Sequence, residues 1–459
     1  MTALEREKLE YSSSGLIKKL KNNHPDLGIS TEEQLSATLN KDSEITATAS
    51  SVFDDLRLKI GRDMRLDHVI FLFGNGASMY AGSQSTMKFS LAEYLKDGNI
   101  AKEFQAIHVE LNRICSSFEG IEEQLNALIT LESYYSIIQD SNTADIVSNL
   151  IDKIKGRLIE SYVNKMDYTG LTWHEVLLRK LRSFGALSKT QIYTTNYDLA
   201  FEYAMDELFI EYRDGFSGFV NRLFDPRTLV ESGKPSLVKI HGSVNWVSED
   251  GRIKAIQPKF EQGHIVIKQD ELKPVLIYPT SNKLHETYST PYSELMRHML
   301  DEMKSGSNAV IVMGYKYGDD HVNEILYKAL ENPRNVFYFF IFDNPDKRDA
   351  PDKRDATDKC DDTDKRDASK KSSFITEVRE LAKNMPNINI LIGPVLASFE
   401  VFVNYILPAA AEKTDEEQII ELLKKTMLKN EQDRYNRRRR FGNDGSLRRC
   451  AAGRGGCAS

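Results

Sequence analysis

The sequence predicts an α/β protein in which a Rossmann-like parallel sheet is flanked by helices and carries a helical insertion or subdomain. Short apolar runs rich in Val, Ile and Phe recur from residue 68 onward, as is typical of strands that are buried on both faces. Segments with helical periodicity, such as 319–332 and 374–384, separate the later runs. This alternation of strands and helices favours a parallel sheet with helices on both faces.

Seven runs are the predicted strands. They cover residues 68–73, 191–195, 237–242, 275–279, 309–314, 336–342 and 388–393. The section between the first two, from about 87 to 185, has a helical pattern and is far longer than an ordinary crossover connection. We therefore expect a helical insertion or subdomain beside the sheet.

Composition divides the chain into three parts. Residues 1–65 are polar and helix-leaning, and the pattern leaves open whether this N-terminal helical arm serves oligomerisation or covers the main domain. Ser30 and Glu33 match a capping box at the start of one of its helices. Residues 66–410 form the predicted main domain. Residues 411–459 read as a C-terminal helix followed by a basic, arginine-rich tail, for which a solvated tail is a simpler account than a nucleic-acid contact.

A charged repeat interrupts the main domain. A six-residue unit, DKRDAP and its variants, occurs four times over 346–369. The segment has almost nothing apolar to bury, so we expect a disordered surface loop over 346–371. A role as a charged docking strip is the alternative.

The bulk properties exclude several classes of protein. The net charge of −7 argues against nucleic-acid binding by the whole protein, and the sequence lacks an apolar stretch of the ~20 residues that would span a bilayer. The cysteines contain no C-x-x-C pair, so we expect neither a four-cysteine zinc site nor any other metal. They are Cys115, Cys360, Cys450 and Cys457. We expect a soluble cytoplasmic protein.

The first predicted strand ends in a glycine turn, FLFGNGAS, which contains Gly74 and Gly76. A glycine turn at the end of a buried parallel strand lets backbone N–H groups approach a phosphate closely, because no Cβ intervenes. A short glycine motif is a weak signal on its own, and a tight turn without a ligand explains it equally well.

Polar residues follow three further strands. Asn196 and Asp198 come after 191–195, His241 ends the next strand, and Gly314 begins another glycine turn. The carboxyl ends of parallel strands meet at one edge of the sheet, where open α/β sheets bind their ligands. Four such clusters at successive strand ends favour a single site.

These motifs together resemble the sirtuin-like family, in the divergent branch of bacterial anti-phage NAD hydrolases. The resemblance covers about 66–410 and rests on GNGAS (74–78), TTNYD (194–198), the loop from Gly218 to Phe224, KIHGSVNW (239–246) and MGYKYGDD (313–320). It implies that NAD is bound by the glycine turns and by the TTNYD motif. The residues implicated in this binding are Gly74, Gly76, Ala77, Ser78, Thr195, Gly314 and Tyr315.

The resemblance also implies catalytic roles. His241 would be the base, Asn196 would hold a water or a ribose hydroxyl, and Asp198 would either stabilise positive charge or fix its own loop. The zinc module of deacylating sirtuins is missing, and MYAGSQSTMKFS (79–90) replaces their acidic-arginine loop. These departures put an acyl-lysine substrate in doubt.

The activity that the resemblance implies is cleavage of NAD⁺ to nicotinamide and ADP-ribose, by the NAD-depleting effector of an anti-phage system. Such an effector is expected to form homo-oligomers and to be controlled by a HerA-type ATPase or another sensor, so that nucleic acid acts only indirectly. A module that senses NAD or a nucleotide without cleaving it, and an ADP-ribosyl transferase, remain open. A nicotinamide-dependent oxidoreductase ranks low because Gly82 is out of register with a Gly-x-Gly-x-x-Gly motif.

Overall fold

The computed structural model describes residues 10–23, 27, 29–39, 49–83, 107, 121–164, 166–261, 263–266, 274–277, 288–342 and 373–409. Its contacts divide the chain into one unit over Met1–Ala410 and a second over Ala411–Ser459. The charged repeat at 346–371, the four cysteines and the C-terminal helix and tail lie outside the described residues.

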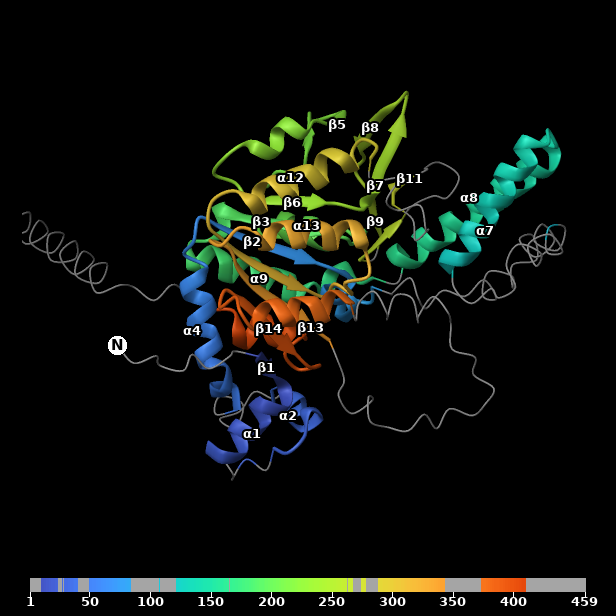
Figure 1. Ribbon diagram of the computed structural model, residues 1–459. Helices are drawn as coiled ribbons and strands as arrows, with labels where there is room; N and C mark the ends of the chain where they lie inside the picture. Colours follow the sequence, from blue (N-terminus) through green and yellow to red (C-terminus); the bar gives the residue numbers. More distant parts are fainter. Residues whose placement is uncertain are drawn as a thin grey trace, which may run out of the picture. The chain divides into compact units, whose positions relative to one another are not determined.

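The central element is a parallel sheet of seven strands in the order β1-β14-β13-β12-β2-β3-β6 (Figure 1). Every neighbouring pair runs parallel. The strands are β1 (Glu10–Ser12), β2 (His68–Phe73), β3 (Thr190–Thr194), β6 (Ser236–Lys239), β12 (Asn308–Met313), β13 (Val336–Ile341) and β14 (Ile388–Ile392). The predicted α/β architecture is confirmed.

A second sheet is antiparallel and has the strand order β11-β7-β8-β5-β4. Its strands are β4 (Phe216–Ser217), β5 (Arg222–Phe224), β7 (Gly242–Glu249), β8 (Arg252–Ala255) and β11 (Pro274–Leu276), while β9 (Lys259–Glu261) and β10 (His264–Val266) form a separate pair. The predicted strand at 275–279 therefore lies in the antiparallel sheet and not in the parallel one. It pairs with β7 at Gly242, where an added Cβ would lie only 2.1 Å from the carbonyl oxygen of Val275.

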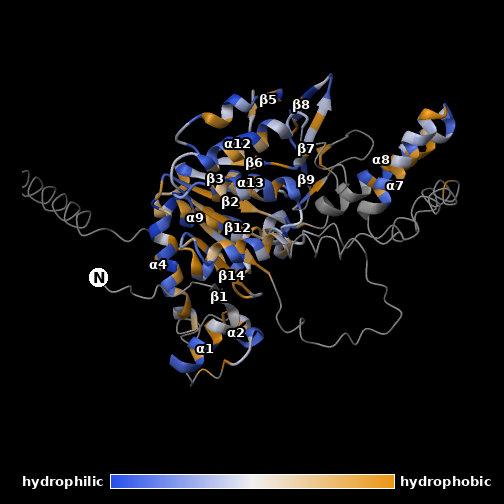
Figure 2. Ribbon diagram, viewed as in Figure 1, coloured by the Kyte–Doolittle hydropathy of each residue, from blue (hydrophilic) through white to orange (hydrophobic). Residues whose placement is uncertain are grey.

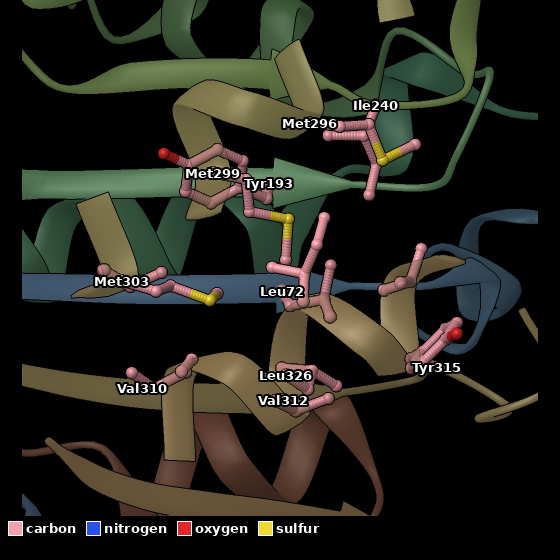
Figure 3. Packing of buried hydrophobic residues seen from close by; sticks show 14 of the residues in the cluster. Leu72, Tyr193, Ile240, Met296, Met299, Met303, Val310, Val312, Tyr315 and Leu326 are labelled. Atoms are coloured by element: carbon pink, nitrogen blue, oxygen red, sulfur yellow. The ribbon is translucent and has the colours of Figure 1, made fainter. Parts of the chain in front are cut away.

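One face of the parallel sheet is covered by α12 (Tyr292–Lys304), α13 (Asp320–Leu330) and a helix over 373–382. Met299 and Met303 of α12 are fully buried in one hydrophobic cluster with Leu72 and Tyr193 of the sheet (Figure 3). Burying an apolar side chain of this size contributes roughly 1.5–3 kcal/mol relative to leaving it exposed. This core fixes the strands whose ends form the candidate site.

The other face is covered by α4 (Asp54–Asp63), α9 (Thr172–Phe184), α10 (Ala200–Glu207) and the segment made of α15 (Phe399–Val401) and η10 (Phe402–Ile406). Phe73 of β2 stacks on Phe201 of α10 and meets Phe399 edge-on. The central strands are the most hydrophobic part of the ribbon in Figure 2. The predicted arrangement, with helices on both faces, is therefore present.

The described part of the N-terminal region packs against this domain. It contains β1, which extends the sheet beside β14, and the helices α1 (Ser13–Asn23), α2 (Glu32–Leu39) and α4. Tyr338 of β13 donates a 2.6 Å hydrogen bond to Asp63 of α4. The capping box of α2 lies one residue later than predicted, because Thr31 accepts from the Gln34 N–H and Gln34 accepts from the Thr31 N–H.

The predicted helical section contains two long helices with a core of their own. Helices α7 (Ile121–Ile137) and α8 (Ser141–Asn164) pack together through Leu128, Leu150 and their neighbours. Helix α9 instead belongs to the layer over the parallel sheet, since it contacts α10 and η10. Short turns are η2 (Ser51–Phe53), η3 (Asn75–Ala77), η4 (Met79–Ala81), η6 (Tyr168–Gly170), η7 (Leu187–Lys189) and η8 (Pro226–Val230). Within the described ranges, every helix is too short or too polar to cross a membrane.

Candidate functional site

The strand order places the four predicted clusters at one edge of the sheet. The chain runs from β2 to β3 and β6 in one direction, and then returns to β12 on the opposite side of β2. Open α/β sheets bind ligands at the carboxyl ends of strands where the order reverses in this way. Gly74 follows β2, Asn196 follows β3, His241 follows β6 and Gly314 follows β12.

The two glycine turns contact each other directly. A Cβ added to Gly76 would lie 2.7 Å from the Cα of Gly314, and one added to Gly74 would lie 2.5 Å from the Gly314 carbonyl oxygen. Gly314 itself has φ +69°, a conformation that favours glycine, and its added Cβ would lie 2.6 Å from the nitrogen of Ala77. Glycine is therefore needed at these positions so that the two backbone turns can pack together. The sequence motif alone does not reveal this requirement.

The N–H groups of the first turn already have partners. Gly76 donates to the Gly314 carbonyl, Ala77 to the Gly74 carbonyl and Ser78 to the Asn75 carbonyl, each at 3.0 Å. A phosphate bound here would share or replace these acceptors. Binding of the pyrophosphate by Gly74, Gly76, Ala77 and Ser78 therefore stays a prediction.

Asn196 is held from two sides. Its backbone N–H donates to Thr194 Oγ1 at 3.0 Å, and its side-chain Nδ2 donates to Ser78 Oγ at 3.1 Å. The residue is only 6% exposed, and its Oδ1 is buried without a hydrogen-bond partner among the residues that the structure describes. An acceptor without a partner in a buried position is costly unless a ligand or water supplies the donor.

The other residues of the TTNYD motif fix the loop. The Thr195 N–H donates to the Phe73 carbonyl at 3.1 Å. Asp198 Oδ1 accepts from the N–H of Ala200, the first residue of α10, at 3.0 Å. Of the two roles considered for Asp198, the loop-fixing contact is present in the structure.

Lys239 also stabilises the TTNYD loop. Its ammonium group donates to the carbonyls of Tyr197 and Asp198 and lies 3.1 Å from Glu202 Oε1. The lysine side chain is 3% exposed. Burial raises the pKa of the Glu202 carboxyl, and the Lys239 charge opposes that rise. This buried lysine was not among the predicted site residues, although it directly precedes the Ile-His-Gly segment in the sequence.

His241 makes its most specific contact with a residue that the sequence motifs did not include. Its Nε2 lies 2.8 Å from Nε2 of His321, in the first turn of α13. The two rings are 5% and 7% exposed. Asn196 and His241 are thus buried, whereas polar residues at the ends of strands are usually expected to be exposed to solvent.

Tyr315 has a supporting position. Its hydroxyl donates to the Asp319 carbonyl and to Asn323 Oδ1 and accepts from the Asp319 N–H, at 3.1–3.2 Å. Burial raises the pKa of this hydroxyl well above its ordinary value. These contacts tie the second glycine turn to the start of α13.

Tyr80 links the first glycine turn to α9. Its hydroxyl lies 2.7 Å from His174 Nδ1 and accepts from the N–H groups of Trp173 and His174 at the start of that helix. Burial lowers the pKa of His174 to about 3, so the ring is neutral at pH 7. The sequence analysis singled out neither Tyr80 nor His174, because no motif contains them and their contact joins residues that are far apart in the chain.

A separate cavity of about 720 Å³ lies between α10 and the antiparallel sheet. Its wall includes Lys239, Glu202 and the ion pair in which Arg222 donates to both oxygens of Asp214 at 2.7 and 2.8 Å. The loop from Gly218 to Phe224 contributes to its rim. The cavity contains none of the predicted site residues.

Among the described residues, no group of three or more His, Cys, Asp or Glu side chains is arranged to hold a metal ion.

One family model matches part of the chain. A family model described as a SIR2-like domain matches residues 190–361, which include β3, the TTNYD loop, His241 and the second glycine turn. No curated protein sequence matches the chain significantly.

Two similar solved structures are sirtuins. A mutant Sir2 homologue in complex with ADP-ribose aligns with a TM-score of 0.32 and 10% identity, over 71% of this chain and 97% of that chain. A sirtuin described in terms of substrate affinity aligns with a TM-score of 0.27 and 13% identity, over 62% and 83%. The fold class stated above rests on the sheet topology and not on these alignments.

Proposed function

We propose that the protein is an NAD⁺ glycohydrolase that cleaves NAD⁺ to nicotinamide and ADP-ribose. The observation that carries the proposal is the buried amide of Asn196. Ser78 accepts a hydrogen bond from its Nδ2, and its Oδ1 has no hydrogen-bond partner within the described part of the chain. His241 follows the adjacent strand at the same edge. The SIR2-like match over 190–361 supports an NAD-related activity.

The chemistry requires little beyond these groups. Breaking the bond between nicotinamide and ribose passes through an oxocarbenium-like centre, and nicotinamide leaves as a neutral molecule. Water then supplies the new oxygen on ribose, and its proton must be removed. Asn196 Oδ1 would accept a hydrogen bond from that water or from a ribose hydroxyl, and His241 would take the proton.

The remaining predicted residues would bind the dinucleotide or support the site. The turns that contain Gly74, Gly76 and Gly314 would hold the pyrophosphate half, and Thr195 would line the ribose pocket. Asp198 would act through the loop that it caps. Tyr315 would act through the start of α13, since its hydroxyl is engaged there.

Product analysis tests this proposal directly. The purified chain is incubated with NAD⁺ labelled separately in nicotinamide and in adenine. We expect equal amounts of free nicotinamide and free ADP-ribose. A sensing module would release neither, and an ADP-ribosyl transferase would release nicotinamide while the adenine label moved to another molecule. Either result would contradict the hydrolase.

The proposed biological role is that of an NAD-depleting effector in anti-phage defence, and it rests on the resemblance of the five sequence motifs. Such an enzyme must be inactive in a healthy cell, so we propose that a homo-oligomeric state and a HerA-type ATPase or another sensor control it. Light scattering on the purified chain, run beside the NAD⁺ assay, tests the assembly. A strictly monomeric and fully active enzyme would contradict control by assembly.

A further inference from the structure

The contact between His241 and His321 restricts where protons can reside. The two Nε2 atoms are 2.8 Å apart, and both rings are buried. A contact of this length between two imidazole nitrogens needs a proton on one atom and a lone pair on the other. The tautomer of one ring therefore fixes the tautomer of the other.

Only one of the two arrangements leaves His241 able to act as a base. If His321 donates, His241 accepts on Nε2 and carries its own proton on Nδ1. It then has no lone pair for a further proton while the contact lasts. If His241 donates, its Nδ1 keeps a lone pair and can accept a proton with the contact intact.

We propose that His321 is a positioning residue. Its Nε2 accepts a hydrogen bond from the Nε2–H of His241, which makes Nδ1 of His241 the basic atom of the site. This inference rests on the proposed function, in which His241 takes a proton from the attacking water. When Nδ1 binds that proton, His241 becomes an imidazolium. Its hydrogen bond to the neutral ring of His321 is then charge-assisted and shorter, which stabilises the cation.

The structure also shows what holds His321 in place. Helix α13 begins at Asp320, and Tyr315 binds both the N–H and the carbonyl of the preceding residue, Asp319. Asn323 of the same helix donates to the Tyr317 carbonyl at 2.9 Å. The second glycine turn and the start of α13 are therefore joined, so His321 has a defined position relative to the turn at Gly314.

Steady-state kinetics test the inference. His321→Leu removes the acceptor, and we expect at least a tenfold fall in kcat for nicotinamide release with KM changed by less than about twofold. His321→Gln restores an acceptor oxygen and should recover part of kcat. Glu324→Gln is the matched control on the same helix, because Glu324 is exposed and forms an ion pair with Lys328, one turn further along α13. Parental kcat in His321→Leu would overturn the inference.

A second measurement reads the tautomer in the parental protein and needs a variant for the assignment alone. In protein labelled with ¹⁵N-histidine, the His241 signals are assigned by their loss in His241→Gln. We expect a protonated Nε2 and an unprotonated Nδ1 at neutral pH. A protonated Nδ1 would overturn the inference.

The two proposals fail in different ways. Parental nicotinamide release by His241→Gln would remove His241 from the proposed function. If His241→Gln lost activity while His321→Leu kept it, the role of His241 would stand and that of His321 would fall.

Discussion

The side chain of Asn196 is bound to that of Ser78 by a hydrogen bond of 3.1 Å, from Nδ2 to Oγ. Ser78 follows β2 and is fully buried, and Asn196 follows β3. The bond therefore joins the ends of two neighbouring strands and orients the amide. It leaves Oδ1 as the group that can meet a ligand.

The first prediction concerns this bond. Ser78→Ala should lower nicotinamide release about tenfold, because the amide of Asn196 loses the contact that orients it. The same change should cost about 1–2 kcal/mol of stability, since a buried donor is left without its partner. Ser133→Ala is the control, because the exposed hydroxyl of Ser133 donates to the Ile129 carbonyl of its own helix. Release at the parental rate by Ser78→Ala would show that the orientation of Asn196 is set elsewhere.

The second prediction asks whether the glycines serve the packing of the two turns or the binding of NAD⁺. Gly76→Ala should lower the melting temperature in the absence of NAD⁺, because the new Cβ would lie 2.7 Å from the Cα of Gly314. Overpacking of this kind typically costs about 1–3 kcal/mol. Gly156→Ala, in α8, meets nothing within 4 Å and should be neutral or stabilising. A Gly76→Ala protein that melts like the parent but binds NAD⁺ poorly would assign the glycine to ligand binding alone.

The third prediction concerns acid stability. Burial lowers the pKa of His174 from 6.5 to about 3, so the folded state binds fewer protons than the unfolded state between these values. This contribution is complete above pH 6.5 and is lost as the pH falls toward 3. At pH 5 the loss amounts to about 2 kcal/mol.

Urea unfolding at pH 7 and pH 5 measures this loss. His174→Gln has no ring to protonate, so its stability should fall less than that of the parent by about the stated amount. All other titrating groups are common to both proteins and cancel in the difference. Equal falls in the two proteins would show that His174 takes up its proton without unfolding.

The fourth prediction concerns the charged repeat. Replacing 346–371 by a short Gly/Ser linker should leave the melting temperature and NAD⁺ cleavage nearly unchanged, because the segment joins β13 to the helix over 373–382 and contains little to bury. Retained fold with lost cleavage would identify the repeat as a regulatory element.

The parallel sheet could be predicted because its central strands are continuous apolar runs that no exposed element would carry. Strand β1 was missed because Glu10–Ser12 has no apolar pattern of its own, although it pairs with β14 in the parallel sheet. The antiparallel sheet was missed because β7 begins at Gly242, and only Ile240 and His241 separate it from the end of β6 at Lys239. When the chain passes from one sheet to another within a single apolar segment, the hydrophobic periodicity of the sequence does not change.

Part of the candidate site could be predicted in the same way. The ends of successive strands must meet at one edge, which places Asn196 and His241 side by side in the strand order. The pairing of His241 with His321 joins residues 80 positions apart and depends on how α13 packs. The burial of these polar groups likewise follows from tertiary contacts and not from local sequence.

Nicotinamide release by Asn196→Ala and His241→Gln, with thermal melts as the folding control, tests the account most directly. We expect each variant to fold and to lose about 10²–10⁴-fold of the activity, as removal of a general base or of its partner group typically does. Asn196→Ala should also raise KM, because it removes the acceptor that orients the substrate. If both folded variants cleave NAD⁺ at the parental rate, the active site lies elsewhere in the chain.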